Sequence, residues 1–126
     1  MNDLNIQETE RTPEIKLSVS DGVFSIRGES FPEDVSAFYG QVIESIDLLK
    51  ENIPDRFQVI IELIYTNSSS IKALYRIFEG FESIRQGGGN LDISWYFQED
   101  DDIMEELGED FHDRFPDLKI NVKPKN

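Results

Sequence analysis

The chain has 126 residues, of which 38% are hydrophobic, and its nine Phe, four Tyr and one Trp are typical of one folded domain. Its 12 basic and 26 acidic residues leave a net charge of −14, which argues against binding to nucleic acids or to anionic membrane surfaces. The absence of cysteine excludes disulfides and thiolate chemistry.

The N-terminal segment, residues 1–13, is polar and acidic and lacks the basic and apolar regions of a signal peptide. We expect it to form a tail or an extension at the edge of a sheet. No apolar run in the chain reaches the length that a membrane span requires. The sequence therefore predicts a cytoplasmic protein without membrane insertion.

Alternating apolar residues predict a first strand over Glu14–Ser20, and Asp21-Gly22 predicts a tight hairpin turn into a second strand, Val23–Arg27. Pro32 and the acids after it predict the first turn of a helix, because proline and acidic side chains favour helix N-termini. Ser30 is a candidate cap for this helix. Apolar residues three and four positions apart continue the helix to about residue 53.

The segment Phe57–Tyr65 predicts a third strand, and its apolar residues on both faces indicate a central place in the sheet. The amphipathic segment Ser69–Gln86 predicts a second helix, which ends at three consecutive glycines. Leu91–Phe97 alternates again and predicts a fourth strand. An acidic third helix is expected over Asp101–His112, and Leu118–Val122 forms either a short last strand or an extended tail.

These elements predict an α/β fold, a two-layer sandwich whose mixed, four- to five-stranded sheet carries helices mainly on one face. The strand–helix–strand connections imply parallel neighbours joined by right-handed crossovers. No linker, low-complexity segment or internal repeat divides the chain. We therefore expect a single domain over residues 14–126.

The residues Asn67, Ser68, Ser69 and Ser70 join the central strand to the second helix. Asn and Ser are favoured helix caps, because their side chains accept hydrogen bonds from free backbone N–H groups. Three consecutive serines exceed what one cap requires, and a helix N-terminus also favours anions. The residues alone leave open a cap, an anion ligand and a phosphorylation switch.

Other candidate sites have simpler structural explanations. The acidic residues 99–110 lack the spacing of an EF-hand loop and are typical of a solvated helix face, although the sequence leaves cation binding open. A Ser-His-Asp triad would have only His112 available, without a nucleophile elbow. Glu62 and Asp92 could form a carboxylate pair, but a hydrogen-bonded sheet surface explains them more simply. We expect no enzyme activity, metal or cofactor.

Three segments together resemble the SiaC family of small bacterial regulatory phosphoproteins. Thr9–Ile15, TERTPEI, is similar to the family's T-x-x-T-P-x-I opening. Gly28–Glu33, GESFPE, followed by Phe38-Tyr39, is similar to its G-x-S-[YF]-P-E motif and the aromatics after it. Tyr65–Ile71, YTNSSSI, is similar to its Y-x-N-[TS]-S-S-I motif. Each segment is short, but the combination is specific and spans most of the chain.

The resemblance implies a SpoIIAA-like, STAS-like fold, which agrees with the element order above. It also implies that the hydroxyl residue after the Asn of the third motif is phosphorylated reversibly. That residue is Ser68 in this chain, and Ser69 and Ser70 are weaker candidates. Family members can carry Thr at this position, so this chain has the smaller hydroxyl residue.

By the same resemblance, a serine/threonine kinase adds the phosphate and a PP2C-type phosphatase removes it. The unphosphorylated protein then activates a diguanylate cyclase in cyclic-di-GMP and biofilm signalling. We expect partner docking around the serines, at Tyr65, Asn67, Ser69, Ser70 and Tyr75. Two alternatives are a partner switch that acts on an anti-sigma factor, and a STAS-like module that binds a nucleotide or small anion at the same helix end.

Overall fold

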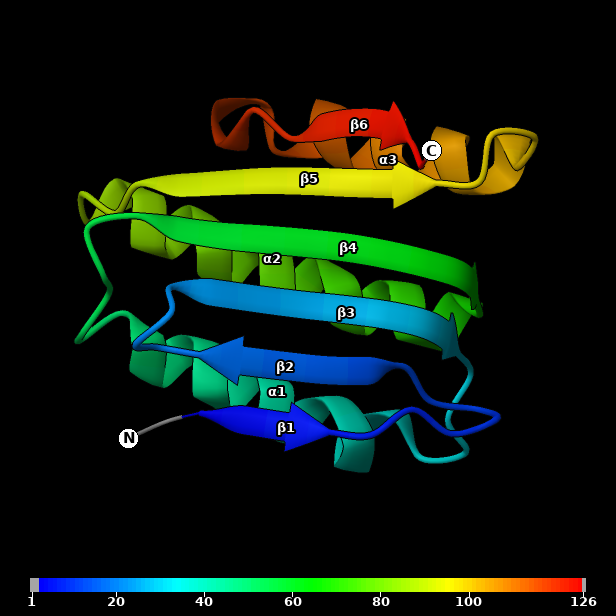
Figure 1. The fold of residues 1–126 in the computed structure, drawn as a ribbon, viewed down its shortest axis with the longest axis horizontal. Coiled ribbons are helices and arrows are strands. Elements are labelled where there is room, and N and C mark those ends of the chain that lie inside the picture. The colour runs from blue at the N-terminus through cyan, green and yellow to red at the C-terminus, as the bar shows by residue number, and fades with distance from the viewer. Residues whose placement is uncertain (1–2, 126) are drawn as a thin grey trace.

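The computed structural model describes residues 3–125, which form a six-stranded sheet with three α-helices (Figure 1). The strands are β1 Leu4–Ile6, β2 Glu14–Ser18, β3 Val23–Ser30, β4 Phe57–Thr66, β5 Leu91–Phe97 and β6 Asn121–Pro124. The helices are α1 Val35–Leu49, α2 Ser68–Gln86 and α3 Asp102–Arg114, and a short 3-10 turn, η1 Pro116–Leu118, precedes β6.

The strands lie side by side in chain order, from β1 at one edge to β6 at the other. β1, β2 and β3 are antiparallel, whereas β3, β4, β5 and β6 are parallel. Figure 1 shows all three helices behind the sheet, so its other face carries no helix. The predicted α/β architecture and mixed sheet are confirmed. The predicted count of four to five strands is wrong, because the sheet of residues 3–125 has six.

The extra strands are short and lie at the two edges of the sheet. β1 pairs with β2 through Leu4–Leu17 and Ile6–Ile15, so this part of the N-terminal segment is an edge strand. β6 begins only at Asn121, later than predicted, because η1 and the left-handed backbone of Lys119 (φ 52°) come first. Strands of three and four residues leave too little alternation in a sequence to be recognised.

The predicted start of the first helix also needs correction. α1 begins at Val35, and the carboxylate of Asp34 caps it by accepting from the N–H of Ala37 over 3.0 Å. Ser30 is not the cap, because β3 continues past Gly28 and ends at Ser30. Gly28 makes this continuation possible: the register with β4 shifts there, and its φ of 118° strongly disfavours other residues.

One hydrophobic core lies between the sheet and the helices. Most inward side chains of β4 and β5 are buried, and those of Val59, Ile61 and Trp95 are at most 1% exposed. The predicted apolar stripe of α2 faces them, with Phe78 and Phe81 fully buried. This packing fixes α2 along β4 and β5, and so fixes where the first residues of α2 meet the edge of the sheet.

Candidate functional site

The loops that follow β3 and β4 meet the N-terminal segment at the carboxyl-terminal ends of the parallel strands. The N–H of Phe31 donates to the carbonyl of Arg11 over 2.7 Å, and the N–H of Asn67 donates to the carbonyl of Ser30 over 3.1 Å. The guanidinium of Arg11 also pairs with Glu33 over 3.0 Å. The three segments that carry the family resemblance therefore lie together around the start of α2.

Asn67 caps α2 and sets the surroundings of the serines. Its side-chain oxygen accepts from the N–H of Ser70 over 2.9 Å, and its carbonyl accepts from Ile71 over 3.0 Å. α2 therefore begins at Ser68, one residue earlier than predicted. The N–H groups of Ser68 and Ser69 belong to the first turn, where a helix has no carbonyl acceptors and the macrodipole is positive.

The three serines differ in their exposure to solvent. Ser68 and Ser69 are exposed, whereas Ser70 is fully buried. The Ser70 hydroxyl has no hydrogen-bond partner among residues 3–125. A protein kinase can therefore reach the hydroxyls of Ser68 and Ser69, while Ser70 becomes accessible only if the first turn of α2 opens.

Tyr65 lies beside the serines, but Tyr75 does not. Tyr65 is 50% exposed, and its ring packs edge-on against Phe31 with 5.7 Å between centroids. The preceding Ile64 is 52% exposed, so this edge of the sheet presents apolar surface. Tyr75 instead stacks on Phe111, with centroids 4.5 Å apart, and belongs to the contact between α2 and α3.

A buried hydrogen bond between the end of β3 and α1 was not predicted from the sequence. The hydroxyls of Ser30 and Tyr39 lie 2.5 Å apart, and both residues are buried. Burial raises the pKa of Tyr39 to about 12, although the hydrogen bond with Ser30 opposes this rise, so the phenol stays protonated. Because the Ser30 carbonyl accepts from Asn67, the bond connects α1 to the start of α2.

Tyr39→Phe is expected to lower the free energy of unfolding by about 1–2 kcal/mol, because the buried Ser30 hydroxyl loses its partner. Urea unfolding followed by circular dichroism measures this loss. Adding Ser30→Ala to the variant should recover part of it, since no buried hydroxyl then lacks a partner. An unchanged unfolding midpoint in Tyr39→Phe would show that the bond does not stabilise the fold.

Glu62 and Asp92 do not form a carboxylate pair. Asp92 lies opposite Gln58 in the register of β4 and β5. Gln58 is four residues from Glu62, or about 13 Å along the strand. The two Glu62 oxygens pair with Arg27 over 2.7 Å and Lys125 over 2.6 Å. Partial burial raises the pKa of Glu62, but hydrogen bonds and charge from Lys125 and Arg27 outweigh it and hold this pKa below its ordinary value.

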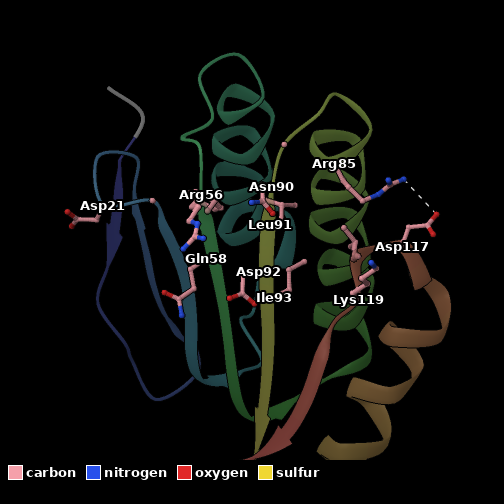
Figure 2. Close-up of a pocket in the computed structure, with 14 residues that line it drawn as sticks. Asp21, Arg56, Gln58, Arg85, Asn90, Leu91, Asp92, Ile93, Asp117 and Lys119 are labelled. Carbon is pink, nitrogen blue, oxygen red and sulfur yellow. Dashed lines mark ion pairs between the residues drawn. The ribbon is translucent and has the colours of Figure 1, made fainter.

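The polar cavity in Figure 2 lies at the opposite end of the sheet, where the parallel strands begin. Its volume is about 1000 Å³, and its lining includes the cations Arg56, Arg85 and Lys119. Arg85 is already paired, to Glu82 over 2.5 Å and to Asp117 over 3.7 Å. Arg85 also lies in the last turn of α2, whereas Ser68 is the first residue of that helix. The small-anion site expected at the start of α2 and this cavity are therefore separate places.

The acidic residues 99–110 form the loop and first turns of α3. Asp101 caps the helix, and its carboxylate accepts from the N–H of Met104 over 3.1 Å. Across the part of the chain that the structure describes, no three His, Cys, Asp or Glu side chains are placed to hold a metal ion. No helix of residues 3–125 is both long and apolar enough to cross a membrane.

Comparison with known proteins identifies relatives over nearly the whole chain. A sequence model of the family described as SiaC family regulatory phosphoprotein matches residues 6–125. An uncharacterized protein of Pseudomonas aeruginosa (strain UCBPP-PA14) is 32% identical over 113 residues, which make up 90% of this chain and 90% of that protein.

Solved structures share the fold over its full extent. The crystal structure of apo-SiaC from Pseudomonas aeruginosa has a TM-score of 0.82 at 30% identity, covering 100% of both chains. A chain in the crystal structure of diguanylate cyclase SiaD in complex with its activator SiaC, from the same organism, has a TM-score of 0.90 at 28% identity. That match covers 98% of this chain and 100% of the other.

Proposed function

The chain belongs to the SiaC family of regulatory phosphoproteins, and from this premise we propose that it is a non-enzymatic switch controlled by phosphorylation of Ser68. A serine/threonine kinase adds the phosphate, and a PP2C-type phosphatase removes it. The unphosphorylated form binds and activates a diguanylate cyclase. The solved complex in which a SiaC is the activator of the cyclase SiaD supports this choice of partner.

The observation that carries the proposal is the exposed Ser68 hydroxyl at the first residue of α2. A phosphoryl group there would add about −1.5 to −2 charges. The free N–H groups of the first turn would stabilise this charge, so the domain should stay folded. The same charge would lose its hydration beneath a bound protein, which is costly. Phosphorylation can therefore change partner affinity without unfolding the domain.

The surroundings of Ser68 favour a protein partner over a small ligand. Ile64 and Tyr65 are each at least half exposed, and Phe31 packs on Tyr65 while remaining half-buried. Aromatic side chains that are partly exposed and held by a neighbour are typical anchors of protein interfaces. The polar cavity of Figure 2, whose lining includes the cations Arg56 and Lys119, lies at the opposite end of the strands.

Incubation with the cognate kinase, followed by intact-mass measurement and peptide mapping, tests the modified residue. We expect one phosphoryl group on Ser68 in the wild type and none in Ser68→Ala. Ser69→Ala is the matched control, because it removes the neighbouring exposed hydroxyl and should be phosphorylated as fully as the wild type. Full phosphorylation of Ser68→Ala would exclude Ser68 as the acceptor.

A further inference from the structure

The polar cavity at the amino-terminal ends of the parallel strands has no part in the proposed switch (Figure 2). Its lining comes mainly from four parts of the chain that are far apart in the sequence: the Asp21-Gly22 turn, the start of β4, the start of β5 and residues 117–119. Its volume of about 1000 Å³ is within the range of sites for small molecules. The cavity is therefore a candidate ligand site, separate from the start of α2.

Backbone hydrogen bonds hold the walls of this cavity in place. The N–H of Gln58 donates to the carbonyl of Gly22 over 2.8 Å, and the N–H of Phe57 donates to the carbonyl of Asn90 over 3.1 Å. Gly22 lies so close to the chain before β4 that a Cβ atom on it would be 2.6 Å from the Arg56 carbonyl oxygen. These contacts fix the start of β4 against its neighbours, so a ligand would meet a preformed site.

Lys119 lines the cavity from an unusual backbone conformation. Its φ of 52° makes it the one residue other than glycine with a positive φ among residues 3–125. This left-handed conformation costs free energy for a lysine, whereas glycine adopts it readily. The ion pair of Arg85 with Asp117 over 3.7 Å ties η1 to α2 just before this residue. Local structure alone would favour glycine here, so a role for the Lys119 side chain in the cavity accounts for the lysine.

Two cations of the cavity have no acidic partner. Arg56 and Lys119 are exposed, and within residues 3–125 neither takes part in an ion pair. Arg56 precedes β4 and Lys119 precedes β6, with β5 between these two strands. Two strand spacings amount to about 10 Å. In a chain with 12 basic and 26 acidic residues, two free cations in one cavity favour a ligand with two anionic groups.

The space between the two cations is polar. Asp92 lies there on β5, opposite Gln58 in the register, and is exposed. Its carboxylate would repel an anion but would accept hydrogen bonds from hydroxyl groups. Phe57, the aromatic residue of the lining, is 1% exposed and offers no ring on which a nucleobase could stack. The lining therefore suits a hydroxylated ligand better than a nucleotide.

We propose that this cavity binds a small polyhydroxylated metabolite with a phosphate group at each end. Arg56 and Lys119 each bind one phosphate, and Asp92 accepts hydrogen bonds from the hydroxyl groups between them. A chain of about six carbon atoms with a phosphate at each end has a length comparable to two strand spacings. The site does not depend on the modification of Ser68, which lies at the other end of the strands.

Titration of the isotope-labelled protein with fructose bisphosphate, followed through its backbone amide NMR signals, tests the proposal. We expect saturable shifts at Gly22, Asn90 and Lys119. Fructose monophosphate and inorganic phosphate should bind at least about tenfold more weakly, because each can engage only one of the two cations. No saturable shift in the cavity at millimolar fructose bisphosphate, or equal affinity for the monophosphate, would overturn the proposal.

Removal of the two cations tests the same site from the side of the protein. Arg56→Gln with Lys119→Gln should weaken binding of fructose bisphosphate by about tenfold or more. Lys72→Gln with Arg76→Gln is the matched control, because it removes the same charge from exposed positions of α2 and should change the affinity less than about twofold. Equal weakening in both double variants would reveal a general effect of charge and would overturn the site.

Lys119→Gly separates a binding role from a structural one. Glycine relaxes the left-handed backbone, so the urea unfolding midpoint should stay the same or rise. The affinity for fructose bisphosphate should nevertheless fall by about fivefold or more, because one phosphate loses its cation. Full affinity in this variant would exclude Lys119 from the site and overturn the proposal of two phosphate ligands.

Discussion

Phosphorylation of Ser68 is expected to weaken binding to the cyclase by about thirtyfold or more, which corresponds to about 2 kcal/mol. The phosphoryl group carries about −1.5 to −2 charges, and a bound partner would displace water from it, which is costly for a charged group. Ser68→Asp brings a single charge and should weaken binding by about tenfold. Ser68→Ala should bind like the wild type, because binding needs no hydroxyl there.

Calorimetric titration of the cyclase with protein carrying phosphoserine at position 68 measures this effect directly. Asn90→Asp is the matched control, since Asn90 is exposed at the opposite edge and the substitution adds the same charge as Ser68→Asp. It should bind like the wild type. Raising the salt concentration would abolish a long-range repulsion but only reduce a local one. Phosphoprotein that binds as tightly as the wild type would contradict the switch.

The sequence predicted the central elements because their signals are local and repeated. The alternation that includes Val59, Ile61 and Leu63 runs through β4 from Phe57 to Leu63, and these three side chains are at most 2% exposed. The start of α2 was placed within one residue, because Asn67 caps the helix through a contact only three residues away. A cap of this kind depends on neighbouring residues and little on the rest of the fold.

Features that depend on distant contacts could not be predicted in this way. Ser30, Pro32 and the following acids have the local signature of a helix start, yet Ser30 belongs to β3 because pairing with β4 extends that strand past Gly28. Its hydrogen bond to Tyr39 requires the final position of α1 on the sheet. The contact between Tyr75 and Phe111 likewise forms only after α3 has packed against α2. These residues have the right chemistry in the sequence, but their partners are set by tertiary structure.

Trp95→Ala is expected to lower the free energy of unfolding by about 3–5 kcal/mol, the largest effect of any single substitution considered for this fold. Trp95 is 1% exposed and stacks on Phe111 with 5.3 Å between centroids. Its indole N–H donates to the carbonyl of Met104 over 3.0 Å. Trp95 therefore joins β5 to α3 by packing and by a buried hydrogen bond, and alanine would remove both.

The space around the indole gives an independent test of the same contact. A Cβ atom on Gly108 would lie 2.6 Å from the indole ring, so Gly108→Ala should also destabilise the fold, by about 1–3 kcal/mol through overpacking. Tyr96→Ala is the matched control, because Tyr96 follows Trp95 in β5, lies on the opposite face of the strand and is only half-buried. Urea unfolding followed by circular dichroism compares the three variants. Trp95 and Gly108 lie on the two sides of one contact between β5 and α3. If Trp95→Ala destabilised the fold no more than Tyr96→Ala, the indole would not hold α3 to the sheet.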